Sequence, residues 1–504
     1  MSNNLNLLTI SQFIGSHDPS LDKEIVILLD EFSGEIVNLK KQDTSVPSGK
    51  YLSFIKANSD GSVAYYKRVV TNDISINIAE VHGDGNTDDS TEIQLLINEM
   101  EPGQVLNLEN KRYMLYAPLI INKAIKIIGS STKSREDRPP FLITHNNDGI
   151  IINNSGTVLE GFSIYNVSSY TTTPNNFTGI KVNGAENYHI YDILLKNITI
   201  IGYKTALEVN YLWSSQIQTL KTSDCQVGIL VKGLSVNNEI SNNTSISIDK
   251  LTSNNKLADI IGSKGIWFDG TTSKEGWRII DTFIFNVYEA IYAEKTSHVN
   301  VLNSMIDFCR HIGIVLAEDC NNWNINSNYI ALSHPGYGIS LANNVSGSQF
   351  TRGNKIIDND ILIYEHSQQD ETSIGINVVG SGSLYDDVRG NSIKNFKVHD
   401  IRALEGLKTT ISNNKCLSEI ETNIVSNFIT NDNLGTVYYQ NLNDSLHLGK
   451  VKITYADAYP TTSSSEWKRG DIILNVGPAV DAPIGWVNTT DGTNTWKPFG
   501  IITA

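Results

Sequence analysis

The hexapeptides "GIWFDG" (265–270) and "AIYAEK" (290–295) are two copies of a motif that recurs through the middle of the chain. Copies begin at residues 179, 206, 228, 265, 290, 313, 338, 375 and 400, so that most steps are 22 to 27 residues and two are 37. The second and fourth positions are apolar in every copy, whereas the positions between them vary. This alternation predicts a short strand with one buried face, repeated once per structural unit.

The segments between the copies decide what kind of repeat this is. Stretches such as "WRIIDTFIF" (277–285) and "WNINSNYIAL" (323–332) supply a second aligned strand and turns that contain Asn or Asp. They contain no amphipathic pattern of helix length, which argues against a βα barrel and against a leucine-rich array. We therefore expect an all-β chain in which residues 179 to about 404 form a parallel β-helix with stacked coils.

The stretch "HGDGNTDDSTEIQLLIN" (82–98) precedes the repeat. Its glycine spacing fits neither a dinucleotide loop nor a calcium loop. Asp88, Asp89 and Ser90 suit the start of a helix. The apolar residues that follow are spaced as one helical stripe: Ile93, Leu96, Ile97 and Met100. We expect a helix from Asp89 to Met100 that caps the first coil, because the open end of a solenoid must be covered.

Charge and composition exclude several classes of function. The net charge of −15 argues against nucleic acid as a partner. The four cysteines are scattered without metal-ligand spacing, so we expect buried thiols and neither a metal site nor a cofactor. We also expect no membrane insertion, since no apolar run approaches membrane-spanning length, and the chain begins without the features of a signal peptide.

The composition shifts along the chain predict four regions. Residues 1–75 are short polar strands and are interpreted as a separate attachment or neck region. Residues 76–130 hold the capping helix and the first strands, and 131–445 the β-helix. Residues 446–504 contain turn glycines, three tryptophans and no coil repeat, which predicts a small β domain for trimerisation or glycan binding. Its tryptophans are more often the core of such a domain than a sugar site.

At this point the sequence resembles a known family. "HGDGNTDDSTEIQLLIN" is similar to the opening signature of pectate-lyase-like β-helix proteins, above all phage tailspikes and capsule depolymerases. "GDIILNVGP" (470–478) and "GWVNTTDGTNTWKPFG" (485–500) resemble a segment that often closes such chains. The resemblance spans residue 76 to the end. It implies a right-handed parallel β-helix in a homotrimeric virion tail protein, assembled in the host cytoplasm and acting at the host cell surface.

The resemblance further implies partners and an activity. The N-terminal part would attach to the phage tail or baseplate. The β-helix would bind and cut a bacterial surface polysaccharide, either capsule or O-antigen. Because fold alone does not specify a reaction, the site has to be argued from the residues.

The repeat itself indicates where such a site could lie. The third and fifth residues of each copy point outward, which places Trp267 above Tyr292 and Asp269 above Glu294 on neighbouring strands. Stacked aromatic faces and a carboxyl pair are what a glycosidase needs. The next coil adds Glu318. Asp269 with Glu294 would suit retention of configuration, whereas Asp269 with Glu318 would suit inversion.

A second cluster competes with this hydrolase site. An alignment of the intervening segments brings four residues to one position: Tyr288, Arg310, His334 and Glu365. His311 follows at the next position. Such groups could bind an acidic sugar or abstract a proton beside a uronate, which is lyase chemistry. Trp277 and Arg278 lie in the turn after the strand at 265, which is interpreted either as an exposed glycan wall or as a simple packed edge.

We thus favour a polysaccharide hydrolase with Asp269, Glu294 and Glu318 as the acid and base set. The residues expected to hold substrate are Trp267, Tyr292, Trp277, Arg278, Arg310, His311 and His334. The alternatives are a polysaccharide lyase and a receptor-binding fibre without enzymatic activity.

Overall fold

The computed structural model divides into two units, Met1–Met305 and Ile306–Ala504, and each is described by itself. The residues that the structure describes are 8–16, 19–21, 23, 25–29, 36–43, 49–70, 72–129, 141–167, 175–242, 244–247, 261–342, 351–364, 373–379, 385–403, 409–422, 428–429, 434–439, 446–448, 451–456, 469–475, 479–490 and 495–501.

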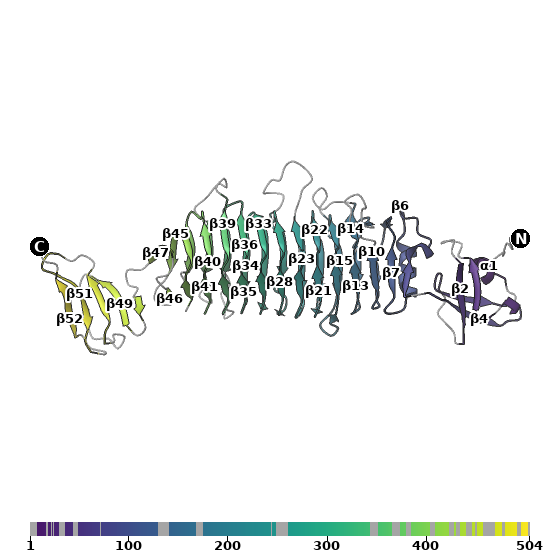
Figure 1. Ribbon diagram of the computed structural model, residues 1–504, viewed down its shortest axis with the longest axis horizontal. Helices are drawn as coiled ribbons and strands as arrows, with labels where there is room; N and C mark the ends of the chain where they lie inside the picture. Colours follow the sequence, from purple (N-terminus) through teal and green to yellow (C-terminus); the bar gives the residue numbers. More distant parts are fainter. Residues whose placement is uncertain are drawn as a thin grey trace, which may run out of the picture. The chain divides into compact units, whose positions relative to one another are not determined.

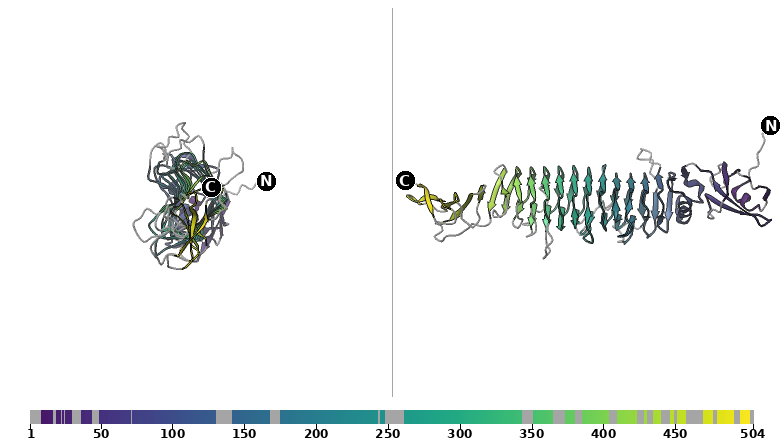
Figure 2. Two further views of the ribbon diagram at one scale, coloured as in Figure 1. Left: turned by 90° about the vertical axis from the view of Figure 1, so that its left-hand side faces the viewer. Right: turned by 90° about the horizontal axis from the view of Figure 1, so that it is seen from below.

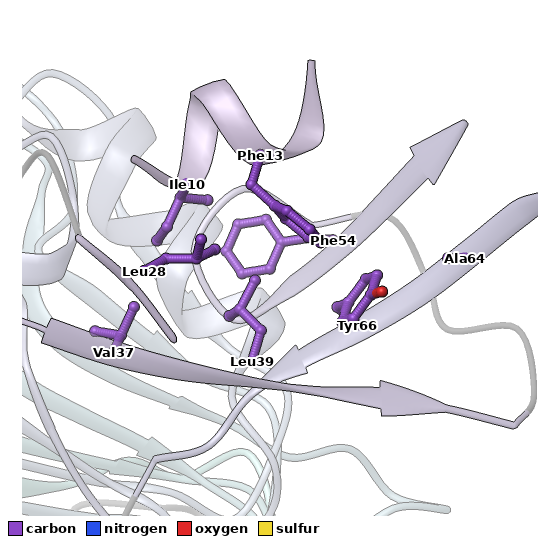
Figure 3. Close-up of a cluster of buried hydrophobic side chains, with 8 residues drawn as sticks. All are labelled: Ile10, Phe13, Leu28, Val37, Leu39, Phe54, Ala64 and Tyr66. Carbon is purple, nitrogen blue, oxygen red and sulfur yellow. The ribbon is translucent and has the colours of Figure 1, made fainter. Parts of the chain in front are cut away.

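The first unit begins with an antiparallel sheet of order β1-β2-β4-β3. The side chains of Phe13, Leu39 and Tyr66 are fully buried between this sheet and the short helix α1 (Figure 3). The Phe13 and Tyr66 rings meet edge to face at 5.2 Å. The elements are α1 (Ile10–Ile14), η1 (Pro19–Leu21), β1 (Ile25–Leu29), β2 (Ile36–Gln42), β3 (Ser53–Ala57) and β4 (Val63–Arg68).

The capping helix α2 runs from Ser90 to Glu99, which confirms the predicted helix, with a start one residue later and an end one residue earlier than expected. Ile93, Leu96 and Ile97 are buried, and α2 packs against β8 (Arg112–Leu115) and β9 (Leu119–Ile121). The carboxylate of Asp89 turns away from the helix and accepts hydrogen bonds from the backbone N–H groups of His82 (2.6 Å) and Gly83 (3.1 Å). The acidic residues therefore tie the preceding turn to the helix start.

Glu99, the last residue of α2, joins the cap to the N-terminal sheet. Its carboxylate accepts hydrogen bonds from four successive backbone N–H groups, those of residues 50 to 53. Charged hydrogen bonds of this kind contribute roughly 1.5–3 kcal/mol. We predict that Glu99→Ala accelerates amide hydrogen exchange across residues 49–57 by about 10- to 100-fold.

Glu101→Ala is the matched control for this prediction. Glu101 forms an ion pair with Lys67 at 2.8 Å, and both side chains are largely exposed. Exposed pairs contribute little, so exchange across 49–57 should stay close to that of the unmodified chain. Equal acceleration by both substitutions would contradict the anchoring role of Glu99.

Parallel coils follow, and each one supplies strands to three ladders (Figure 1). Within the first unit the strands of successive coils lie side by side (Figure 2). The first ladder consists of β5 (Asp73–Ser75), β7 (Val105–Leu108), β10 (Lys126–Gly129), β13 (Val158–Glu160), β17 (Leu194–Lys196), β21 (Gln216–Gln218), β24 (Glu239–Ser241), β28 (Arg278–Ile280) and β32 (Asn300–Leu302), with η2 (Ile76–Ile78) after β5.

The second and third ladders of the first unit belong to one larger sheet. The second consists of β6 (Asp84–Asp88), β8, β11 (Phe141–Thr144), β14 (Ser163–Asn166), β18 (Thr199–Ile201), β22 (Lys221–Ser223), β25 (Ser245–Ser247) and β29 (Phe283–Phe285). The third consists of β9, β12 (Ile150–Ile152), β15 (Thr178–Asn183), β19 (Thr205–Asn210), β23 (Val227–Lys232), β26 (Lys264–Phe268) and β30 (Glu289–Glu294). Short corner strands pair as β16 (Ile190–Tyr191) with β20 (Leu212–Trp213) and β27 (Lys274–Glu275) with β31 (Thr296–Ser297).

The predicted alternation of the repeat is confirmed in the third ladder. Ile266 and Phe268 in β26 are fully buried, as are Ile291 and Ala293 in β30. These are the second and fourth positions of the copies "GIWFDG" (265–270) and "AIYAEK" (290–295). The chain is therefore a parallel β-helix with its core inside the coils.

The second unit, described by itself, has strands in the same three-ladder pattern and ends in a small sheet. Its ladder strands are β33 (Met305–Cys309), β34 (Ile312–Glu318), β35 (Asn324–Asn326), β36 (Tyr329–Leu332), β37 (Tyr337–Ala342), β38 (Lys355–Ile357), β39 (Asp360–Ile363), β40 (Ile374–Val379), β41 (Asp387–Arg389), β42 (Ser392–Lys394), β43 (His399–Ala403), β44 (Thr410–Ser412), β45 (Lys415–Thr422), β46 (Phe428–Ile429) and β47 (Leu434–Tyr439). The terminal sheet consists of β48 (Leu446–Leu448), β49 (Val451–Ala456), β50 (Ile472–Asn475), β51 (Pro483–Asn488) and β52 (Trp496–Ile501).

The terminal sheet has its own small core of Ile473, Trp486 and Trp496. Both tryptophans are only 8% exposed, as expected of core residues. Trp467 lies outside the described residues. All four cysteines are buried thiols, and none forms a disulfide bond, as the scattered spacing predicts.

A ladder of buried asparagines stabilises one edge of the coils in the second unit. Asn328 donates from Nδ2 to Oδ1 of Asn359 (3.0 Å), Asn359 donates to Asn391 (2.9 Å), and Asn391 donates to Asn414 (3.0 Å). Each Oδ1 also accepts from the backbone N–H of the preceding member. The ladder satisfies polar groups that would otherwise be unpaired in the interior.

Candidate functional site

A groove of about 560 Å³ lies over the outer face of the third ladder in the first unit, across β15, β19, β23 and β26. The groove follows a row of residues that are in register on neighbouring strands: Glu208 is opposite Leu230, and Leu230 is opposite Trp267. These are third positions of successive repeats, which point outward. The side chains that give the groove its chemistry are Lys204, Glu208, Lys232, Lys264, Trp267 and Asp269. The groove thus combines three ammonium groups, two carboxylates and one indole.

Trp267 and Tyr292 lie opposite each other on β26 and β30, which confirms the predicted aromatic pair. The ammonium of Lys264 lies between them, 5.4 Å from the Trp267 ring centre and 4.2 Å from that of Tyr292, and it is ion-paired with Glu289. The indole Nε1 of Trp267 is buried and has no hydrogen-bond partner among the described residues. A buried donor without a partner is uncommon in a folded protein.

Asp269 is only 8% exposed and lines the same groove. Its Oδ1 accepts from the buried ammonium of Lys274 (2.8 Å) and from the hydroxyl of Thr271 (2.8 Å). Burial lowers the pKa of Lys274, and the neighbouring Asp269 opposes that shift. The ion pair therefore holds the Asp269 side chain in one position.

Glu294 lies beside Asp269, as the repeat predicts. A Cβ on Gly270, the residue after Asp269, would lie 2.4 Å from Oε2 of Glu294. The Glu294 carboxylate therefore lies directly against the turn that begins at Asp269. The hydroxyl of Tyr292 donates to its other oxygen, Oε1, at 2.8 Å. The structure thus brings Asp269, Glu294, Trp267 and Tyr292 together.

Glu208 is a carboxylate of the groove that the sequence analysis missed. It is 9% exposed, and Lys232 (3.2 Å) and Lys181 (3.7 Å) form ion pairs with it. Glu208 lies two strands from Asp269, with β23 between β19 and β26. Glu208 is the third residue of "ALEVNY" and so occupies the same outward position in the repeat as Trp267. The repeat pattern could therefore have identified Glu208 as a candidate site residue.

The interpretation of Trp277 as part of an exposed glycan wall is wrong. Trp277 is fully buried, its Nε1 donates to the carbonyl of Ser235 (3.1 Å), and its ring meets Phe268 edge to face at 5.4 Å. It lies two residues before the inward-pointing Ile279 and therefore shares its face of the strand. Arg278, by contrast, is exposed and pairs with Glu239 at 3.1 Å.

The second unit brings Arg310 and His334 together. Arg310 Nη1 donates to His334 Nδ1 at 3.3 Å, and the guanidinium lies 4.4 Å from the Phe308 ring centre. Because a guanidinium only donates, Nδ1 is an acceptor and the imidazole proton is on Nε2. His311 is half-buried next to Arg310, and Glu318 is half-buried at the end of β34. Glu365 lies outside the described residues, and Tyr288 belongs to the first unit.

A tyrosine pair near this cluster was not predicted. Tyr364 donates to Oδ1 of Asp307 at 2.7 Å, and its hydroxyl is 3.5 Å from that of Tyr329. Burial, followed by the hydrogen bonds to Tyr329 and Asp307, raises the pKa of Tyr364. Tyr364 is thus a protonated donor at neutral pH. With His334 in the tautomer above, these groups suit ligand binding better than proton abstraction.

His334 provides a test of this arrangement. Burial, and then the charge of Arg310, lower the pKa of His334 below its ordinary value of 6.5. The neutral imidazole therefore contributes stability above about pH 6.5, which is lost as the pH falls towards the lowered pKa. We predict that an NMR titration places the His334 inflection below 6.5. Arg310→Ala should move it upward, and an inflection at or above the ordinary value in the unmodified chain would contradict the contact.

The described residues contain no group of three or more His, Cys, Asp or Glu side chains arranged to hold a metal ion. Among the same residues, no helix combines the length and apolar character needed to cross a membrane.

No protein-family model matches the chain, and no curated protein matches it. Among solved structures, the A-module of the Azotobacter vinelandii mannuronan C-5 epimerase AlgE6 is 10% identical, with a TM-score of 0.50 over 73% of this chain and 96% of that one. The Dettilon tailspike protein is 14% identical (TM-score 0.44, 74% of this chain and 69% of that one). The enzymatically active domain of bacteriophage CBA120 tailspike protein 2 is 13% identical (TM-score 0.47, 96% and 67%). At these identities the likeness concerns the fold alone, which in this chain is a parallel β-helix.

Proposed function

We propose that this protein is a phage tailspike that binds and depolymerises a bacterial surface polysaccharide by glycoside hydrolysis. One observation carries the proposal: the groove of the first unit combines an aromatic face at Trp267 with the carboxylates of Asp269 and Glu208. Flat apolar faces pack against sugar rings, and a carboxyl pair supplies acid and base.

The chemistry follows from two carboxyl groups on neighbouring strands. Glu294 as general acid would donate a proton to the glycosidic oxygen as its bond to the anomeric carbon breaks. Asp269, whose carboxylate is paired with Lys274, would attack the anomeric carbon and form a glycosyl ester. Water, giving a proton back to Glu294, would then attack the same carbon and release both the sugar and the Asp269 carboxylate. Neighbouring strands are ~4.8 Å apart, which suits the spacing of roughly 5–5.5 Å in retaining enzymes.

Glu208 supports a second arrangement of the same reaction. It lies two strands from Asp269 and is in register with Trp267, two residues before Asp269, so the two Cα atoms are ~12 Å apart. The two side chains would have to extend towards each other to reach the roughly 6.5–9.5 Å of inverting enzymes. Glu318, which the repeat predicts as the partner of Asp269 in an inverting set, lies in the second unit and stays a prediction. NMR of the first product distinguishes the arrangements within the first unit, because the Asp269–Glu294 pair retains the anomeric configuration and the wider Asp269–Glu208 pair inverts it.

The groove lysines suggest an acidic repeating unit in the substrate. Lys204, Lys232 and Lys264 lie in one groove of a protein whose net charge is −15. The chain as a whole would repel an acidic polymer, whereas the groove offers it ammonium groups. Arg310, His311 and His334 are proposed as further substrate contacts.

Digestion of purified capsule and O-antigen preparations tests the function. Hydrolysis is expected to shorten the polymer and to release one new reducing end per cut, without near-ultraviolet absorbance. A rise in that absorbance would instead reveal a lyase, because elimination leaves an unsaturated sugar. Binding with constant chain length would instead indicate a receptor-binding fibre.

The same proposal assigns functions to the N-terminal and C-terminal regions of the chain. Residues 1–75 would attach a homotrimer to the tail or baseplate, and 446–504 would trimerise the chain or bind glycan. The antiparallel sheet that ends at Arg68 and the five-stranded terminal sheet are the folded elements available for these roles. The protein would then act at the host cell surface as part of the virion tail.

A further inference from the structure

Four aromatic rings from two successive coils gather at a corner of the first unit, outside the groove. Tyr191 in β16 is opposite Trp213 in β20, and His189 and Tyr211 lie two residues before them. The His189 ring is stacked with Trp213 (4.7 Å, 14°) and with Tyr211 (5.8 Å, 10°). Tyr191 meets Trp213 edge to face at 5.7 Å. We call His189, Tyr191, Tyr211 and Trp213 the aromatic platform.

The platform lies on the surface, and a hydrogen bond orients one of its rings. Tyr191 is 39% exposed, and His189, Tyr211 and Trp213 are each partly exposed. The indole Nε1 of Trp213 donates to the carbonyl of Leu234 at 2.9 Å, which orients the ring. Large exposed rings that already hold one conformation lose little entropy when a ligand binds.

A polar hollow of about 320 Å³ begins at Ser214, the residue after Trp213. All of the described residues that line it, apart from Gly276, carry polar side chains. Its rim includes Asn237, Glu239 and Arg278, with the last two ion-paired at 3.1 Å. The volume is at the low end of the roughly 300–1,000 Å³ typical of small-molecule sites.

The floor of the hollow is rigid. Asn238 donates from Nδ2 to the carbonyl of Leu212 (2.8 Å), and its Oδ1 accepts from the backbone N–H of Ser215 (3.0 Å). Both Asn238 and Ser215 are buried. The same backbone that carries Trp213 therefore positions the hollow beside the platform.

We propose that the platform and the hollow form a second polysaccharide-binding site, separate from the groove. A sugar ring would pack its C–H face on Tyr191 and Trp213 and place its hydroxyl groups among Asn237, Glu239 and Arg278. A second copy of this chain fits less well, because the core of a stable protein interface is depleted of charged residues, whereas this hollow is lined by polar and charged ones. The choice of polysaccharide as ligand rests on the proposed function. The site would hold a long polymer while another part of it occupies the groove.

The experiment measures retention of the full chain on immobilised bacterial capsule and O-antigen polysaccharides. Tyr191→Ala and Trp213→Ala should each weaken retention at least about tenfold, the loss expected for an aromatic anchor. Tyr191→Phe keeps the ring and should retain binding within about threefold. Arg278→Ala in the hollow should also weaken binding, and it keeps the test decisive if Trp213→Ala fails to fold.

Tyr116→Ala is the matched control. Tyr116 is 51% exposed and is stacked on His145 at 4.8 Å, so its removal also deletes an exposed ring from an aromatic–histidine stack. It lies outside the platform, and retention should be unchanged.

The outcomes separate this inference from the proposed function. If the unmodified chain cuts a polysaccharide but the platform variants retain it fully, the second site is refuted and the proposed function stands. If no polysaccharide is cut but retention depends on the platform, the proposed hydrolase fails while the site stands. Light scattering completes the test: loss of oligomers in Tyr191→Ala, with retention per chain unchanged, would assign the platform to an interface between copies and overturn the inference.

Discussion

Asp269→Asn is expected to lower the rate of polysaccharide cleavage at least about a hundredfold. Asp269 lies in the groove beside Trp267, and an amide cannot act as nucleophile or base. The ion pair with Lys274 positions the carboxylate, so the substitution also tests whether a charge at this point matters. Reducing-end release from a substrate that the unmodified chain cuts is the measurement.

The Asp269 experiment needs a check on folding, since the substitution leaves the buried ammonium of Lys274 without its carboxylate. Circular dichroism should show intact strands. Glu294→Gln should give a comparable loss without affecting Lys274's ion pair. Glu160→Gln removes a carboxylate from an ion pair with Lys196 (2.7 Å) on the first ladder and should leave the rate unchanged. Normal rates in both Asp269→Asn and Glu294→Gln would remove the catalytic assignment.

Trp277→Ala is expected to lower the free energy of unfolding by about 3–5 kcal/mol. The indole is fully buried against Phe268 and donates a hydrogen bond to Ser235, so its removal leaves both a cavity and an unpaired carbonyl. Denaturation followed by circular dichroism in the far ultraviolet is the appropriate measurement, because it does not depend on tryptophan fluorescence.

Arg278→Ala is the control for this substitution. Arg278 is the next residue along the strand but points to solvent, where its ion pair with Glu239 contributes at most about 1 kcal/mol. A stable Trp277→Ala chain that no longer bound polysaccharide would return Trp277 to the glycan wall predicted from the sequence.

The contrast between these two residues shows what sequence periodicity can establish. The alternation in the nine repeats identified the buried face of the third ladder, the parallel β-helix and the aromatic pair of Trp267 and Tyr292. The same rule would have placed Trp277 inside, since it lies two residues before Ile279. Strand parity, rather than the chemistry of Trp and Arg in a turn, therefore decides which face Trp277 occupies.

Other parts of the site depend on contacts that periodicity does not contain. Glu208 occupies the outward third position, but its burial depends on Lys181 and Lys232 from the two flanking coils. The pairing of Lys274 with Asp269 depends on the path of a short turn. The aromatic platform depends on a corner strand only two residues long, which is too short to leave an alternating pattern.

The asparagine ladder of the second unit restricts how this chain can change its length. Asn359 and Asn391 each bond the equivalent residue of the next coil, through both the side chain and the backbone. Loss of one residue from a strand would displace an asparagine from this row and turn inward side chains outward. Loss of a complete coil would bring equivalent asparagines together again. We therefore expect insertions and deletions in the strands of this unit to comprise a complete coil. Shorter insertions and deletions are expected only in the turns.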